Sequence, residues 1–125
     1  MLTVNQKKSF DVIVAEQHSA ITVGSGDLSV LGTPAMIALM EQASVQLVTP
    51  LLEEGTSTVG IHLSVEHLKA TPMGAKITVS AELTAIDGRK LTFALKAVNA
   101  ENETIGEGTL DRFIIDKERF MAKLS

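Results

Sequence analysis

Hydrophobic and polar residues alternate with a period of two along several parts of the chain. Residues 9–14 form one such segment, with Phe10, Val12 and Val14 on the same side. The same period returns after residue 55, in segments 59–65, 77–85 and 91–97, and a last strand is expected over residues 104–115. The dipeptide Asp87-Gly88 is typical of a tight hairpin. The pattern predicts a mainly antiparallel sheet.

One long helix is predicted from Thr33 to about residue 54. Thr33 is expected to cap the free amides of the first turn, and Pro34 suits the first helical position because its missing N–H costs nothing there. Pro50 removes a backbone hydrogen bond and should kink or split the helix, and Gly55 is a suitable C-terminal stop. Residues 17–31, which precede the helix, show no regular pattern.

The predicted elements favour one α+β domain over residues 1–125, with Asp116 capping a short closing helix. A meandering antiparallel sheet must cover its apolar side, and the long helix is the only element available to do so. A curved antiparallel sheet wrapped around one long central helix is the hot-dog fold. Its exposed edge strand predicts a homodimer, since pairing across a two-fold axis removes the unpaired edge.

Composition narrows the functional classes. The chain is 45% hydrophobic and 21% charged, which predicts a folded protein, and no apolar run approaches the roughly 20 residues of a membrane helix. Its first eight residues lack the apolar core of a secretory signal. Because the chain contains no cysteine, disulfides and thiol nucleophiles are excluded, and a reducing cytoplasm is the expected location.

Charge and aromatic content argue against nucleic acid as a partner. The formal net charge is −4, and the four phenylalanines are the only aromatic residues, so there are few platforms for base stacking. The histidines at positions 18, 62 and 67 do not form a convincing metal-binding set. We expect neither a metal nor a redox cofactor.

Glu41 interrupts an apolar stripe of the predicted helix. Ile37, Val45, Val48 and Leu52 recur at helical spacing, and Glu41 lies in the middle of that series. Burial there would disfavour the charged carboxylate unless hydrogen-bond donors compensate. The alternative is a structural glutamate at the border of the apolar face, with its carboxylate in solvent or bonded to a backbone amide.

His67 has the same parity as Val59 and Val65 and is therefore expected to face the core side of its strand. A single inward histidine is more often structural than catalytic. The hydroxyl of Thr33 would lie at a helix N-terminus, where developing negative charge is favoured. A cap and a donor in an active site are compatible roles.

Four segments of the chain carry a resemblance to a known family. Residues 32–41, GTPAMIALME, and residues 60–71, GIHLSVEHLKAT, resemble segments of the fluoroacetyl-CoA thioesterase-like family of hot-dog proteins, the first of them the start of that family's central helix. The hairpin around residues 79–91 and the ending IGEGTLDR at residues 105–112 are similar as well. The joint spacing of a threonine, a glutamate and a histidine gives the resemblance its specificity.

The resemblance implies hydrolysis of an acyl-CoA thioester by Thr33, Glu41 and His67, with Gly60 close to the bound thioester. Glu41 would attack the carbonyl directly or activate a water, and the sequence does not choose between these routes. The stretch from residue 20 to residue 31 lacks the aromatic residue of the fluoroacetyl-specific member. The preference for fluoroacetyl-CoA is therefore not transferred.

Binding of CoA phosphates requires cations, and Lys69, Arg89 and Arg112 are candidates on or near the strands. Arg112 has the alternative of pairing with an acid on the core side. The competing function is a non-catalytic module that binds an acyl-CoA or another small acid, and a dehydratase is a weaker third option. The homodimer could assemble further into a tetramer.

Overall fold

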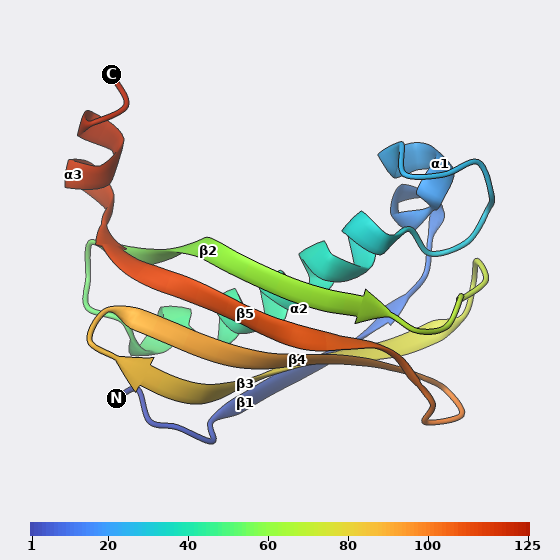
Figure 1. Ribbon diagram of the computed structural model, residues 1–125, viewed down its shortest axis with the longest axis horizontal. Helices are drawn as coiled ribbons and strands as arrows, with labels where there is room; N and C mark the ends of the chain where they lie inside the picture. The colour runs from blue at the N-terminus through green and yellow to red at the C-terminus, as the bar shows by residue number, and fades with distance from the viewer.

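The computed structural model describes residues 1–125 and consists of one five-stranded sheet and one long helix (Figure 1). All neighbouring strands are antiparallel, in the order β1-β3-β4-β5-β2. The strands are β1 (Lys7–Ile13), β2 (Thr56–His67), β3 (Lys76–Asp87), β4 (Lys90–Asn99) and β5 (Thr104–Asp116). The helices are α1 (Ala20–Val23), α2 (Thr33–Val48) and α3 (Lys117–Ala122). No helix is both long and apolar enough to cross a membrane.

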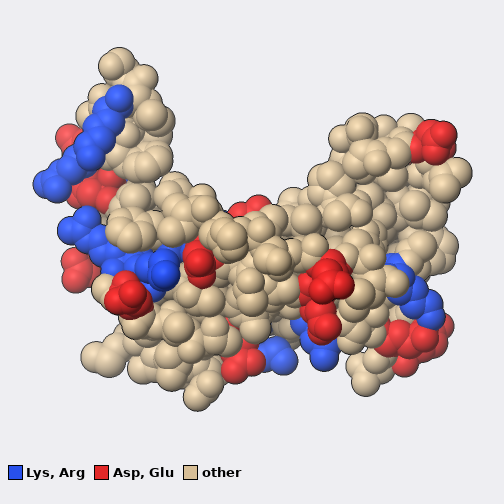
Figure 2. Space-filling model, viewed as in Figure 1, with Lys and Arg blue, Asp and Glu red and all other residues tan.

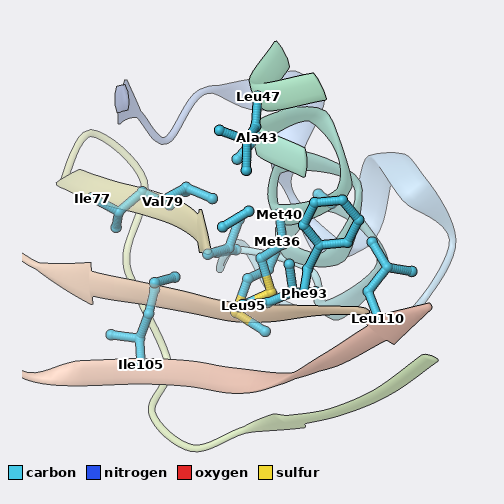
Figure 3. Close-up of a cluster of buried hydrophobic side chains, with 14 of the residues drawn as sticks. Met36, Met40, Ala43, Leu47, Ile77, Val79, Phe93, Leu95, Ile105 and Leu110 are labelled. Atoms are coloured by element: carbon cyan, nitrogen blue, oxygen red, sulfur yellow. The ribbon is translucent and has the colours of Figure 1, made fainter. Parts of the chain in front are cut away.

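The predicted curved sheet with one covering helix is confirmed. The core lies between α2 and the concave side of the sheet, where Met36, Met40 and Leu47 of the helix face Val79 of β3 and Phe93 of β4 (Figure 3). These side chains are at least 92% removed from solvent. The alternating residues predicted to face inward from β3 and β4 are buried, except at the outer end of β3, where a register shift precedes Ala85.

The α-helix ends earlier than the sequence predicts. It stops at Val48, and Thr49–Leu51 form a single 3₁₀ turn that contains Pro50. The proline therefore splits the predicted helix, as expected from its missing N–H. Gly55 has a φ of 85°, which glycine adopts without steric cost, and it leads into β2.

The predicted apolar stripe of the helix is only partly confirmed. Val48 is fully buried and Leu52 packs against the core, but Val45 is 36% exposed and Ile37 is partly exposed. Much of the buried face of α2 is formed instead by small and flexible residues, among them Met36, Met40 and Ala43. Glu41 therefore lies on the flank of α2 beside the edge strand β2. Its side chain is 37% exposed.

The edge strand β2 contains a β-bulge at Ile61. Gly60 pairs with Arg112 and His62 pairs with Asp111, so Ile61 is an extra residue without a partner. A bulge of this kind changes the parity of the residues on either side of it. The prediction that residues 59–65 share one face is therefore wrong, and Ile61 is 53% exposed.

The remaining local predictions hold at the chain ends and in the turns. β3 and β4 are joined by the predicted hairpin, in which Gly88 has a φ of 61°. Asp116 caps α3, since its Oδ1 accepts a hydrogen bond from the Arg119 amide at 2.9 Å. The irregular stretch before α2 contains the short helix α1 and a 3₁₀ turn.

Candidate active site

Thr33 and His67 form a polar pair where the start of α2 meets the end of β2. The Thr33 Oγ1 lies 2.7 Å from Nδ1 of His67. The N-cap of α2 is Gly32, and Thr33 is the first helical residue, so the predicted capping role of Thr33 is wrong. Its hydroxyl is available to orient the imidazole instead.

The imidazole of His67 is partly removed from water. Burial lowers its pKa, and the nearby backbone of Lys69 offsets this effect only in part. Its Nε2 atom is buried and has no hydrogen-bond partner. A neutral ring fixed through Nδ1, with Nε2 unused, can exchange a proton with a bound molecule or hydrogen-bond to it.

Glu41 is held by a buried arginine from β5. The Nη1 of Arg112 donates to Oε2 of Glu41 at 3.0 Å. Arg112 also donates from Nε to the Thr58 hydroxyl and from Nη2 to the Thr58 carbonyl, each at 2.9 Å. Burial lowers the pKa of Arg112, while the charge of Glu41 and its hydrogen bond oppose that shift. Each of the three guanidinium nitrogens has a protein partner.

Gly60 provides the space for this carboxylate. It pairs with Arg112 across the β2–β5 ladder. A Cβ atom at this position would lie 3.1 Å from Oε2 of Glu41 and 3.5 Å from Nη1 of Arg112. A side chain here would crowd the ion pair. The absence of one leaves the Gly60 backbone accessible from the Glu41 side.

The two groups lie in separate hollows of the single chain. Thr33 and His67 line one of about 380 Å³, together with Leu28 and Leu68. Glu41 lines a second, of about 250 Å³. Thr33 and Glu41 are eight residues apart on α2, which corresponds to roughly 12 Å along its axis. The carboxylate of Glu41 and the imidazole of His67 therefore do not line the same hollow within one chain.

The three cations considered for CoA phosphates are dispersed. Lys69 lines the Thr33–His67 hollow, but its ammonium lies 2.6 Å from Glu103. Arg112 pairs with Glu41, which is the core-side acid considered as the alternative from the sequence. Arg89 lies at the β3–β4 turn and lines a cavity at that end of the molecule.

Sequence reasoning did not identify Thr58. This residue is 93% buried and binds Arg112 through both its hydroxyl and its carbonyl. A threonine in a strand is unremarkable, and the bulge at Ile61 hides the fact that Thr58 faces the helix. No group of three or more acidic, histidine or cysteine side chains in the structure could hold a metal ion.

Comparisons with known proteins agree with this architecture. The model of the fluoroacetyl-CoA-specific thioesterase family matches residues 14–118. The fluoroacetyl-CoA thioesterase of Streptantibioticus cattleyicolor is 41% identical over 95 residues, which cover 76% of this chain and 68% of that protein. A mutant of a fluoroacetyl-CoA thioesterase, solved in complex with acetyl-CoA, superposes with a TM-score of 0.92. That alignment has 31% identity and covers 98% of this chain and 96% of the other.

A solved structure with lower sequence identity has the same fold. A hot-dog-like protein from Thermanaerovibrio acidaminovorans superposes with a TM-score of 0.90 at 17% identity, covering 98% of this chain and 90% of the other. The family match spans most of the chain, including the Thr33–His67 and Glu41–Arg112 pairs. The chain belongs to the fluoroacetyl-CoA-specific thioesterase family of hot-dog-fold thioester hydrolases.

Proposed function

We propose that this thioester hydrolase cleaves a small acyl-CoA with Glu41, Thr33 and His67. The observation that carries the proposal is the state of the Glu41 carboxylate. Arg112 bonds its Oε2, while Oε1 has no hydrogen-bond partner and belongs to a side chain that lines a hollow beside Gly60. A fixed carboxylate with one free oxygen is suited to accept a proton from water or to attack a carbonyl.

The reaction needs only water besides the thioester. In the general-base route, Oε1 of Glu41 takes one proton while the water oxygen attacks the carbonyl carbon. The carbon–sulfur bond then breaks, the acid is released, and the proton leaves on the CoA thiol. In the nucleophilic route, Oε1 attacks the carbonyl carbon, the carbon–sulfur bond breaks, and a mixed anhydride and the CoA thiolate form. Water then hydrolyses the anhydride, which releases the acid, restores the Glu41 carboxylate and supplies the proton that the thiolate takes up. In both routes Thr33 and His67 hold the substrate or transfer the proton, and the Gly60 amide approaches the carbonyl oxygen.

We further propose a homodimer that pairs its β2 strands. β2 is an unpaired edge, and Ile61 and Leu63 near its middle are 53% and 40% exposed. This edge forms the floor of a saddle between the raised ends that carry α1 and α3, and Figure 2 shows that floor to be mostly uncharged. A second copy covers the apolar edge and satisfies its backbone groups.

The same pairing supports one complete site from two chains. Glu41 lies beside Gly60 in the first half of β2, and His67 is the last residue of that strand. Antiparallel pairing about the middle of β2 brings the first half of one strand beside the second half of the other. Glu41 then faces the partner's His67 and the partner's Thr33 across the interface. A tetramer would require a further contact between such dimers.

We propose a short acyl group without a preference for fluoroacetyl-CoA. The segment over residues 20–31 contains no aromatic residue, and Leu28 from this segment is 66% exposed at the rim of the Thr33–His67 hollow. No side chain of this segment therefore closes over the hollow as an aromatic lid would. A location in the cytoplasm is part of the proposal, since a chain free of cysteine suits a reducing compartment.

A panel of acyl-CoA thioesters tests the function directly. Acetyl-, fluoroacetyl-, propionyl-, butyryl- and longer acyl-CoAs are incubated with the protein, and released CoA is measured with a thiol reagent. Turnover of the short members, with kcat/KM for fluoroacetyl-CoA close to that for acetyl-CoA, is expected. Tight binding without release of CoA from any member would instead support the acyl-CoA binding module.

A further inference from the structure

The helix α3 stands away from the body of the molecule and packs little against its own chain. It rises beyond the free edge of the sheet at one end of β2 (Figure 1). None of its residues is buried, and only Phe120 is partly covered. Met121 and Leu124 are largely exposed, and their spacing of three residues places them on one side of the last helical turn. This apolar side of α3 has no partner within the chain.

A second apolar patch without a partner lies around the Thr33–His67 hollow, at the other end of β2. Leu28 and Leu68 line this hollow, and both are more than half exposed. Ile21 of α1, which belongs to the same raised end of the molecule, is exposed to a similar extent. The rim of the hollow is therefore apolar and uncovered in the single chain.

The helix α3 cannot cover this hollow in its own chain. The Lys117 amide donates to the Gly55 carbonyl at 3.0 Å, so α3 begins beside the first residue of β2, whereas His67 is the last residue of that strand. The 12 residues of β2 span roughly 36 Å. The six residues of α3 extend over only about 9 Å. A copy of α3 that reaches the hollow must therefore come from another chain.

The proposed pairing of two β2 strands brings the two apolar patches together. In an antiparallel pair about the middle of β2, the start of one strand lies beside the end of the other, about 5 Å away. The helix α3 is long enough to pass over this distance, and it stands on the side of the sheet from which the second copy approaches (Figure 1). Each raised end of the saddle then stands beside the opposite raised end of the partner.

The charges of the two raised ends are complementary. Residues 117–124 contain three lysine or arginine side chains and one acid, whereas residues 16–31 contain two acids and no lysine or arginine. Figure 2 shows basic side chains on the end that carries α3 and an acidic side chain at the tip of the end that carries α1. Lys69, the one lysine or arginine that lines the hollow, is paired with Glu103. The antiparallel arrangement therefore places the cations of α3 beside acids rather than beside the other copy of α3.

We propose that α3 of each chain docks on residues 20–31 of its partner and forms the outer wall of the partner's Thr33–His67 hollow. The apolar side of α3 lies against the partner's Leu28 and the partner's Leu68, and its cations lie beside the acids of the partner's α1 end. The inference rests on the proposed homodimer and adds a contact at each end of its interface. It also supplies the apolar cover that residues 20–31 do not provide over the bound thioester.

Disulfide cross-linking tests this contact, because the chain contains no cysteine of its own. Leu28→Cys chains and Leu124→Cys chains with different affinity tags are co-expressed, oxidised mildly and separated without reducing agent. We expect a covalent pair that carries both tags. Leu28→Cys chains combined with Glu101→Cys chains are the matched control and should give no such pair, since Glu101 lies in the β4–β5 turn, at the opposite end of β2 from α3.

A second experiment measures what the contact contributes. Met121→Ser/Leu124→Ser should raise the dissociation constant of the dimer roughly tenfold or more, because the two copies together lose four buried apolar side chains. At concentrations where this variant is still dimeric, its KM for acetyl-CoA should also rise, because the hollow has lost its cover. Val4→Ser/Ile13→Ser is the control, since it removes two exposed apolar side chains on the β1 side of the molecule and should change neither quantity.

The outcomes separate this inference from the proposals on which it rests. A protein that sediments as a dimer but gives no Leu28–Leu124 cross-link, or as much product with Glu101→Cys, overturns the docking of α3 and leaves the dimer in place. An unchanged dissociation constant in Met121→Ser/Leu124→Ser also overturns it. A monomeric protein removes the dimer and the inference together, and binding of that monomer to vesicles of anionic lipid would assign α3 to a membrane surface. The cross-link forms without substrate, so a failure to hydrolyse acyl-CoA does not affect it.

Discussion

Arg112 holds the carboxylate of Glu41 at 3.0 Å, and the two partners differ in exposure: the arginine side chain is 10% exposed and the glutamate side chain 37%. Thr58 fixes the buried guanidinium of Arg112 through two hydrogen bonds. Arg112 in turn fixes the more exposed carboxylate of Glu41. The arrangement places a charged group at the surface with a defined orientation. Arg112 is thus a positioning residue.

Replacement of Glu41 by glutamine should abolish most of the activity. Glu41→Gln keeps the size of the side chain and a hydrogen-bond acceptor for Arg112, but it removes the base or nucleophile. We expect kcat for a short acyl-CoA to fall by about a hundredfold or more. Glu101→Gln, in an exposed turn, is the control and should retain wild-type kcat. An unchanged rate in Glu41→Gln would return Glu41 to a structural role.

Loss of the hydrogen bonds that the Arg112 guanidinium makes should lower both the stability and the activity of the protein. Arg112→Met leaves Glu41 and both Thr58 oxygens without their partner, and we expect the free energy of unfolding to fall by about 2 kcal/mol. Arg112→Lys retains the charge but cannot bind Glu41 and Thr58 together, so it should keep most of the stability while kcat falls. Denaturant midpoints and kcat measured on both variants check this. Wild-type kcat in Arg112→Lys would show that Glu41 needs no orientation.

The hydroxyl of Thr33 should contribute to activity by orienting His67, and it should contribute little to the stability of α2. Thr33→Val removes the hydrogen bond to Nδ1, and we expect kcat to fall about tenfold, while Thr33→Ser retains most of the activity. His67→Ala should also lower kcat while leaving a folded protein. Circular dichroism, thermal unfolding and steady-state kinetics separate these effects. A loss of stability in Thr33→Val with no change in kcat would favour a purely structural hydroxyl.

The partly buried imidazole predicts a loss of stability at acidic pH. Because burial lowers the pKa of His67, the unfolded chain binds the proton more strongly than the folded protein does. The free energy of unfolding should therefore decrease as pH falls below about 6.5, the ordinary pKa of histidine. Urea midpoints between pH 7.5 and 5 should show a smaller decrease in His67→Gln than in wild type. An equal decrease in wild type and in His67→Gln would contradict this prediction.

A site shared between two chains predicts complementation. Glu41→Gln and His67→Ala are each expected to have little activity, but a mixed dimer of the two variants contains one site with both native groups. If the chains pair at random, half of the dimers are mixed and one of their two sites is intact, so about a quarter of wild-type activity should return. Purification through two different affinity tags after co-expression isolates the mixed dimer, which by itself should show about half of wild-type activity. A mixed dimer without activity would place all catalytic groups of a site in one chain.

The sheet was largely predictable because its central strands follow the simplest rule. β3 and β4 alternate cleanly from Ile77 and from Leu91, with a buried side chain at every second position until the register shift before Ala85. The helix start was also visible from Pro34. Its buried face was visible only in part, because methionine, alanine and serine make up most of it beside Leu47 and Val48, whereas Ile37 and Val45 are not buried.

The catalytic candidates were found more readily than their arrangement. Glu41 and His67 are polar residues in apolar surroundings, which makes them visible in the sequence. Their separation into two hollows follows from the direction of α2 relative to β2, which periodicity does not report. The pairing of Arg112 with a core-side acid was one of two alternatives open from the sequence, but its contact with Thr58 was hidden, because that contact depends on which strand lies next to β2. A sequence pattern describes one strand at a time and contains no information about its neighbours.

The bulge at Ile61 decides which face of the sheet Gly60 and His67 share. Gly60 and His67 are seven residues apart, an odd number, so a regular strand would point them to opposite faces of the sheet. The single unpaired residue between them turns both toward α2. Removing Ile61 would leave both Gly60 and His67 in the chain and yet turn one of them away from α2.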